Sequence, residues 1–180
     1  SGGIAEIREI LDVQLAEAGE TIHRKRAGIV NRLAPLVADY YRELSGDREQ
    51  IELSYSSELN DMPFTEILGR NLEKDRLMQF TTGGVHRDDM KMRLGGYPLR
   101  KYGSQGQQKS FLIALKLAQY MVVAEEKGEK PILLLDDLFD KLDLDMVEKL
   151  LELVSRPDFG QIFITDCNKF RLEDILRRGN

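Results

Sequence analysis

The chain has 180 residues, which is enough for one sizeable hydrophobic core and a small second one. Hydrophobic residues make up 42% of it and charged residues 32%, as in an ordinary globular protein. The net charge of -5 excludes a surface that is positive all over, so any contact with nucleic acid must use local basic patches.

The cysteine count and the hydropathy pattern indicate in which cellular compartment the protein is expected. A single cysteine, Cys167, excludes an internal disulfide framework and fits a reducing cytoplasm. No run of apolar residues approaches the roughly 18 that a membrane span needs, and no signal-peptide pattern opens the chain. We therefore expect a cytoplasmic protein with no membrane association.

The first 44 residues carry apolar side chains at helical spacing and predict a helical hairpin or arm. Pro35 lies inside this pattern, where it predicts a kink or a new helix start, and Gly46 predicts the stop. The first apolar stripe consists of Ile4, Ile7, Leu11, Leu15, Ala18 and Ile22. The second consists of Ile29, Leu33, Leu36, Val37, Tyr40 and Leu44.

The middle of the chain changes period twice. Alternating apolar residues predict strands at Ile51–Tyr55 and Met90–Leu94, and a helical pattern at Phe64–Met78 lies between them. Gly95 and Gly96 then predict a tight hairpin turn.

The last 80 residues predict an α/β unit with two buried parallel strands joined by a helical crossover. The predicted elements are a helix from Gln105 to about Lys127, a strand at Ile132–Leu135, a helix at Leu144–Val154, a strand at Ile162–Thr165 and a short last helix.

Two adjacent acids, Asp136 and Asp137, end the first of these strands. In open α/β sheets ligands bind at the carboxyl ends of the strands. One carboxylate there can hold Mg²⁺, and the other can orient or deprotonate an attacking water. The alternatives are that Asp137 or Asp140 only caps the next helix, or that the acids belong to a receiver-like phosphoacceptor module.

A polar pentapeptide, Gly103-Ser104-Gln105-Gly106-Gln107, stands directly before an apolar helix. Glycines allow close backbone approach, and a helix N-terminus offers free N–H groups to an anion. A hydroxyl and two amides add further donors, so the segment suits a phosphate. The alternative is a glycine-rich loop with an ordinary N-cap.

Together these motifs resemble those of the ATP-binding-cassette ATPases. The signature Leu-Ser-Gly-Gly-Gln of that class stands here as Gly103–Gln107, with the serine, second glycine and glutamine kept. The Walker B motif matches Leu133–Asp136, followed by Asp137 where most members have glutamate. The D-loop would be Asp140–Asp143, and Thr165-Asp166 takes the switch position without the usual histidine.

The ordered set of motifs resembles the RecF family of bacterial recombination mediators within this class. The segments that carry the likeness are LDVQLAEAG, RNLEKDR, GGVHRDDM, YGSQGQQKSFLIALKLAQ and LLLDDLFDKLD. The resemblance implies the C-terminal half of an ATPase head with a helical arm. Residues 1–76 would form the arm, or lobe II, with a short strand, and residues 77–180 the C-terminal ATPase subdomain.

The resemblance also implies residue roles in a nucleotide site shared between two subunits of an ATP-dependent homodimer. Asp136 and Asp137 would be catalytic, and Asp136 would hold Mg²⁺. ATP would be contacted by Ser104, Gln105, Gly106, Gln107, Asp143 and Asp166. Ser104 and Gly106 would act in trans, closing over the γ-phosphate of the partner's ATP.

For the biology, the resemblance implies slow ATP hydrolysis, binding of DNA at single-strand/duplex junctions, and cooperation with RecO and RecR in loading recombinase. We expect DNA contacts at four basic residues on and after the second strand, with a solvated strand face as the alternative. They are Lys91, Arg93, Arg100 and Lys101. The run His23–Arg26 on the arm is the next candidate.

No G-x-x-x-x-G-K-[ST] loop occurs in the 180 residues, so the chain alone is not expected to hydrolyse ATP. In the RecF family that loop lies in the N-terminal half, which makes this chain look like a C-terminal portion. A structural-maintenance-of-chromosomes-like head or an overcoming-lysogenization-defect nuclease-like head is the alternative within the class. His86-Arg87-Asp88 resembles a kinase catalytic loop, but the asparagine expected five residues later is Arg93.

Overall fold

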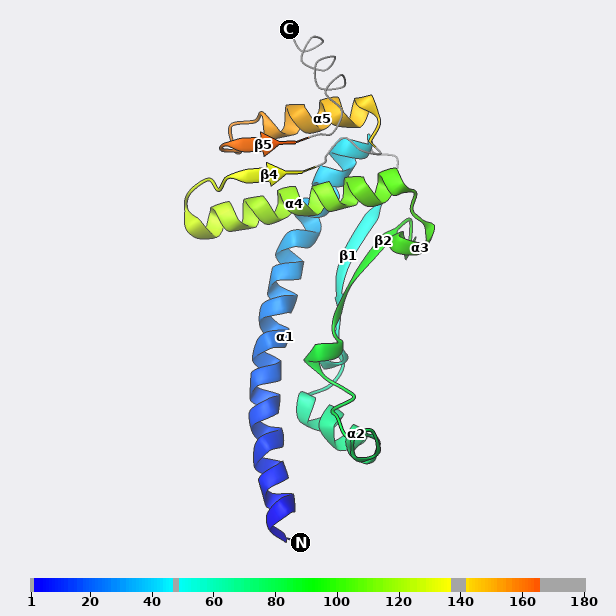
Figure 1. The fold of residues 1–180 in the computed structure, drawn as a ribbon, viewed down its shortest axis with the longest axis vertical. Helices are drawn as coiled ribbons and strands as arrows, with labels where there is room; N and C mark the ends of the chain where they lie inside the picture. Colours follow the sequence, from blue (N-terminus) through cyan, green and yellow to red (C-terminus); the bar gives the residue numbers. More distant parts are fainter. Residues whose placement is uncertain (1, 47–48, 137–141, 166–180) are drawn as a thin grey trace. The chain divides into compact units, whose positions relative to one another are not determined.

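The computed structural model describes residues 2–46, 49–136 and 142–165. The helices are α1 (Gly2–Ser45), α2 (Phe64–Met78), α3 (Leu99–Tyr102), α4 (Gln105–Lys127) and α5 (Leu144–Val154), with 3-10 turns η1 (Glu58–Asn60) and η2 (Val85–Arg87). The strands are β1 (Ile51–Ser56), β2 (Asp89–Leu94), β3 (Tyr97–Pro98), β4 (Leu133–Leu135) and β5 (Ile162–Ile164). Figure 1 shows these elements along the chain.

The described chain forms two compact units, and each is built from two stretches of sequence. The first combines residues up to 31 with 53–91, and the second combines 32–52 with the described residues from 92 onward. The predicted division into residues 1–76 and 77–180 concerns ATPase lobes and stays a prediction. Among the described helices, none is both long enough and apolar enough to cross a membrane.

The predicted arm is a single helix and not a hairpin. α1 continues through Pro35, which is exposed, as is Asn31, whose carbonyl would otherwise accept a hydrogen bond from residue 35. Water can satisfy that carbonyl, so the proline does not end the helix. The predicted stop is confirmed, because Gly46 takes a φ of 75° and its N–H donates to the Arg42 carbonyl at 2.9 Å.

The two apolar stripes of α1 differ in burial. Val37 and Leu44 of the second stripe are buried in the second unit. The first stripe stays exposed in the described structure, with Ile7 60%, Leu11 56%, Leu15 41% and Ile22 39% exposed. Helical spacing predicts which residues share a face, but it does not say what covers that face.

The core of the first unit surrounds Phe64, the first residue of α2. Ala16, Ile67 and Leu68 are buried with it, and Leu59 and Met62 pack against this cluster. A side chain at Gly19 or at Gly84 would overlap the Phe64 ring, so these glycines leave the space that the ring fills. The helix predicted at Phe64–Met78 is confirmed with both bounds.

The alternating segments form a sheet with strand order β1-β2-β3. β2 and β3 are antiparallel, with Leu94 opposite Tyr97. The predicted hairpin turn is confirmed, because Gly95 and Gly96 take φ angles of 54° and 83°, which favour glycine.

The second unit contains the predicted parallel pair, with Leu133 opposite Ile162 and Leu135 opposite Ile164. In the view of Figure 1 this pair lies between α4 and α5. Its core includes buried residues of both helices, such as Phe111, Leu117 and Leu150. The prediction of fully buried strands is wrong for one face, because Leu134 is 64% and Phe163 49% exposed. The predicted last helix lies outside the described residues.

Candidate functional site

The N-terminus of α4 is closed by a capping box. Ser104 is the N-cap in an extended conformation, and its Oγ accepts the Gln107 backbone N–H at 3.2 Å. In return the Gln107 side-chain Oε1 accepts the Ser104 backbone N–H at 2.6 Å. Two backbone donors at the helix start are thereby satisfied by two side chains.

The capping box decides which donors remain for a ligand. The first N–H groups of an α-helix have no acceptor within the helix, and the box uses those of Ser104 and Gln107. The N–H groups of Gln105 and Gly106 stay at the positive end of the helix dipole. The Ser104 oxygen accepts through a lone pair, so its hydroxyl proton can still be donated. This arrangement suits an anion such as a phosphate.

The turn before α4 requires the glycine at position 103. A Cβ there would lie 2.7 Å from the Leu99 carbonyl oxygen, which is closer than real Cβ contacts allow. The Gly103 N–H donates to this carbonyl at 2.8 Å, and the Gly103 carbonyl accepts from Gln108 Nε2 at 2.9 Å. Only Gly103 and Ser104 thus precede α4, and Gln105–Gln107 form its first turn. The N-cap of the alternative interpretation is confirmed at Ser104, and binding of a phosphate there stays a prediction.

The second part of the predicted site lies where β4 and β5 end. Asp136 directly follows β4 and is exposed, and its Oδ1 accepts a hydrogen bond from the Thr165 hydroxyl. The Thr165 N–H donates to the Leu135 carbonyl at 3.0 Å. Both strands thus end at the same edge, as expected for a parallel pair. Asp137, Asp140 and Asp166 lie outside the described residues.

The oxygen atoms at this edge of the sheet are of the type that binds Mg²⁺. Asp136 offers carboxylate oxygens and Thr165 a hydroxyl, and Mg²⁺ is usually held by one or two carboxylates together with water and phosphate oxygens. Within the described ranges there is no group of three His, Cys, Asp or Glu side chains that could hold a metal ion.

Asp143 caps α5. Its Oδ1 accepts the Met146 backbone N–H at 2.8 Å, which is the usual task of an N-terminal aspartate. The role that the resemblance gives to Asp143 in a nucleotide site stays a prediction beside this structural one.

The four basic residues predicted to contact DNA are all exposed. Lys91 and Arg93 lie on β2, two positions apart and so on one face of the strand, and Arg100 and Lys101 lie in α3. Their contact with DNA stays a prediction.

Sequence reasoning missed two tyrosines beside these residues in the second unit. Tyr97 is 63% and Tyr102 59% exposed, and their rings make an edge-on contact with 5.5 Å between centroids. Lys101 Nζ lies 5.2 Å from the centre of the Tyr102 ring. Aromatic residues interleaved with basic ones were a usable signal, because nucleic-acid surfaces combine stacking rings with cations.

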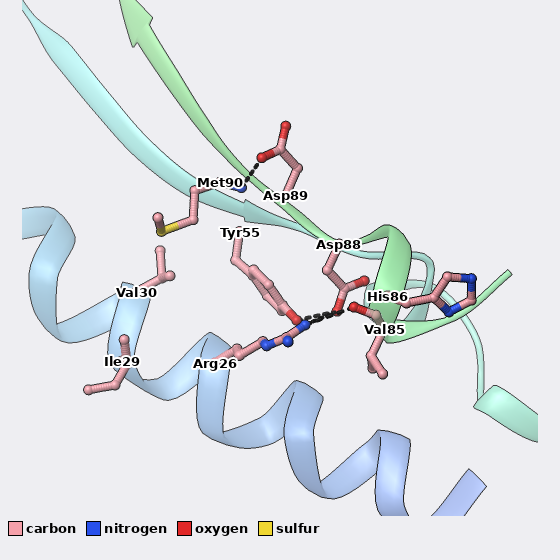
Figure 2. Close-up of a pocket in the computed structure, with 9 residues that line it drawn as sticks. All are labelled: Arg26, Ile29, Val30, Tyr55, Val85, His86, Asp88, Asp89 and Met90. Atoms are coloured by element: carbon pink, nitrogen blue, oxygen red, sulfur yellow. Dashed lines mark hydrogen bonds and ion pairs between the residues drawn. The ribbon is translucent and has the colours of Figure 1, made fainter. Parts of the chain in front are cut away.

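The segment His86-Arg87-Asp88 forms part of a separate cluster in the first unit (Figure 2). The Asp88 side chain is only 2% exposed, and its Oδ2 accepts a hydrogen bond from the Tyr55 hydroxyl. Arg26 reaches over from α1, with its guanidinium 3.7 Å from Asp88 Oδ2 and 2.7 Å from the Val85 carbonyl. Burial, followed by the hydrogen bond to Asp88, raises the pKa of Tyr55.

These contacts give Asp88 a structural role. A hollow of about 420 Å³ lies beside it, lined by residues of α1, β1, η2 and β2. The His86 ring bonds the Thr81 carbonyl at 2.8 Å. Asp88 thus joins α1 to the start of β2, and the arrangement of a kinase catalytic loop is absent from this described segment. Arg26 belongs to the run His23–Arg26 that the sequence offered as a DNA-contact candidate, and here it bonds within its own unit. The sequence did not indicate the contacts of Tyr55 and Arg26 with Asp88, since they depend on the fold.

Two comparisons point to one family, while no family model matches the chain. The chain is 44% identical over 172 residues to the DNA replication and repair protein RecF of Parabacteroides distasonis, covering 96% of this chain and 47% of that protein. It is 42% identical over 173 residues to the RecF of Bacteroides thetaiotaomicron, with the same two coverages. The chain spans about half the length of the curated relatives that it matches.

Solved structures agree. The chain superposes on the recombination mediator protein RecF with ATP, of the RecFOR pathway, with a TM-score of 0.75 and 30% identity over 91% of this chain and 46% of that one. RecF with ATPrS gives a TM-score of 0.74 and 29% identity. This match favours an ATPase fold over a receiver-like module. Over nearly its whole length the chain is thus homologous to the C-terminal portion of RecF, and it shares the fold of that ABC-type ATPase.

Proposed function

We propose that this chain is the C-terminal part of a DNA-repair ATPase in which the N-terminus of α4 senses the γ-phosphate of ATP held by a second subunit. The observation that carries the proposal is the capping box, because it uses the Ser104 oxygen as acceptor and leaves its proton for donation. RecF structures with ATP share this fold. Gly106 and Gln105 would add backbone N–H groups at the positive end of the helix.

Asp136 would act in the subunit that holds the nucleotide. Mg²⁺ bound there would neutralise phosphate charge, and the Thr165 hydroxyl would keep the Asp136 carboxylate oriented toward the strand ends. Asp137 would orient the attacking water, as the resemblance implies. Because the signature and Asp136 serve different nucleotides, ATP joins two subunits, and hydrolysis releases them.

We further propose that the dimer binds DNA at single-strand/duplex junctions and works with RecO and RecR to load recombinase. The solved RecF neighbours are described as members of the RecFOR pathway. The exposed cations Lys91, Arg93, Arg100 and Lys101 would contact the phosphate backbone.

The test is nucleotide-dependent association, measured by sedimentation velocity. A protein that joins this chain to a RecF-type N-terminal half with a Walker A loop should be monomeric with ADP and dimeric with MgATPγS. The chain alone should bind MgATP more weakly than about 1 mM, since the phosphate loop and its lysine supply most of the affinity. A dissociation constant for MgATP near 10 µM for the chain alone would contradict the proposal. So would a joined protein that forms the same amount of dimer with ADP as with MgATPγS.

A further inference from the structure

The signature glutamine has a second hydrogen bond, which involves a residue far away in the sequence. Gln107 Nε2 donates to Glu49 Oε1 at 2.6 Å. Glu49 lies in the described part of the connection between α1 and β1. The other oxygen of this carboxylate, Oε2, accepts from the Tyr41 hydroxyl of α1 at 3.1 Å. All three residues belong to the second unit.

The contacts around Glu49 are firmly held. Tyr41 is 1% exposed, and burial together with the neighbouring Glu49 carboxylate raises its pKa, so the hydroxyl remains a donor. The residue after Glu49 is fixed as well, because the Gln50 carbonyl accepts the Gly95 N–H at 2.8 Å. The carboxylate is therefore presented to α4 from a position that the backbone and the core define.

The polarity of Glu49 fixes the orientation of the Gln107 amide. A carboxylate accepts and cannot donate, so it selects the NH₂ end of the amide. The carbonyl end must then face the Ser104 backbone N–H, where it completes the capping box at 2.6 Å. The flipped amide would set its carbonyl against the carboxylate and its NH₂ against an N–H group, losing both bonds.

We propose that Glu49 is a positioning residue for the phosphate-sensing end of α4, and that Tyr41 ties it to α1. Glu49 orients Gln107, Gln107 closes the capping box, and the box holds the Ser104 hydroxyl at the start of the helix. The nucleotide part of this inference rests on the proposed function, whereas the orientation of the amide does not. α1 and the signature are thereby linked through three side chains.

The first test uses the 180-residue chain without nucleotide. Amide hydrogen exchange measured by NMR should show the Ser104 N–H exchanging about tenfold faster in Glu49→Ala, which is the loss of one hydrogen bond of about 1.4 kcal/mol. Glu49→Gln keeps a carbonyl that can accept from Gln107 but adds an NH₂ group that can also favour the flipped amide, so its Ser104 rate should lie between those of wild type and Glu49→Ala. Glu43→Ala is the matched control, because it removes an α1 carboxylate that pairs instead with Arg156. An unchanged Ser104 rate in Glu49→Ala would overturn the proposal.

The second test adds the nucleotide. In the protein that carries a Walker A loop, Glu49→Ala should weaken association with MgATPγS about tenfold, or about 1.4 kcal/mol, while the affinity of the monomer for the nucleotide stays unchanged. Glu49→Gln should restore association only in part. The free energy of unfolding of Glu49→Ala, measured with urea, separates this effect from a loss of general stability. Normal association in Glu49→Ala would overturn the positioning role in ATP sensing. A wild-type protein that fails to associate contradicts the proposed function, and the exchange rates then decide the orientation of Gln107 separately.

Discussion

The helices α4 and α5 both begin with a side-chain N-cap, and the two capping groups differ in their chemistry. In each, an extended residue accepts the backbone N–H three positions ahead, with Gln107 bonding Ser104 at 3.2 Å and Met146 bonding Asp143 at 2.8 Å. The cap of α4 is a hydroxyl and that of α5 is a carboxylate. The first turn of α5 also carries an acid, Asp145, whereas the first turn of α4 has none.

This difference separates helix stability from ligand binding. An ionised carboxylate is a strong cap near the positive helix end, but it has no proton to donate and it repels phosphate. A serine hydroxyl caps with one lone pair and keeps a proton for a ligand. Both helices have a side-chain N-cap, although only α4 has the second bond of a capping box, so the chemistry of the cap residue is what makes α4 the candidate phosphate sensor.

Ser104→Asp would give α4 the same carboxylate cap as α5. Of the changes considered, it should have the largest effect on nucleotide-dependent association. Aspartate is as good a cap as serine, so the free energy of unfolding should stay within about 0.5 kcal/mol. The carboxylate would face the γ-phosphate of the partner, so association with MgATPγS should weaken at least about 100-fold, or roughly 2.7 kcal/mol. Sedimentation and urea unfolding measure the two effects on one variant.

Asp143→Ser provides the reciprocal control. It gives α5 the cap of α4, and because α5 still carries Asp145 the start of α5 should bind no phosphate. Any loss of association in this variant would come instead from the predicted nucleotide role of Asp143. A loss of association in Ser104→Asp but not in Asp143→Ser would assign the effect to the cap of α4, whereas equal losses in both would show that it is not specific to that cap.

The segment before α4 offers a second contrast, since Arg100 and Lys101 lie in α3, and only Tyr102 separates them from the pentapeptide. Replacing these two together with Lys91 and Arg93 by glutamine should weaken DNA binding about tenfold or more. The slope of log K against log salt should fall by about 0.9 for each phosphate that the variant no longer neutralises. Lys116→Gln with Lys127→Gln, on exposed positions of α4, is the control. An unchanged slope in the fourfold variant would direct the search to His23–Arg26.

Local sequence was enough to predict most elements and the cap of α4. A serine followed three residues later by glutamine, ahead of an apolar helix, is a local capping pattern, and the structure has both of its bonds. The strands beside Gly95 and Gly96 follow from alternation and turn chemistry in the same way. In these cases the determining contacts lie within a few residues of one another.

Features that depend on distant residues were not predictable. Glu49 meets Gln107 across 58 positions, and Tyr55 meets Asp88 across 33, and neither pair leaves a local pattern. Pro35 predicts a kink or a new helix start, but α1 continues through it, since water can replace the missing bond at this exposed position. Which residues pack against the first apolar stripe of α1 likewise depends on distant parts of the protein, and helical periodicity does not predict it.

Tyr41, which bonds Glu49, should make the free energy of unfolding depend on pH in the alkaline range. Its pKa is raised in the folded chain, so the protonated form is favoured by folding. The stabilisation is complete below the ordinary tyrosine pKa of about 10 and is lost as the pH rises above that value. Between about pH 10 and 12, the free energy of unfolding should fall more steeply in wild type than in Tyr41→Phe, by at most about 1.4 kcal/mol per pH unit. Parallel curves in urea titrations would show that the hydroxyl titrates normally.

The smallest expected effect concerns the cap of α5 on its own. Asp143→Ala removes the acceptor for the Met146 N–H and should lower the free energy of unfolding by about 1 kcal/mol. Asp143→Asn keeps the acceptor, loses only the charge at the positive helix end, and should cost about 0.3–1 kcal/mol at low ionic strength and less in high salt. Urea unfolding of both variants at two salt concentrations separates the hydrogen bond from the charge. If asparagine is as damaging as alanine at both salt concentrations, then an amide oxygen does not replace the carboxylate as the cap of α5.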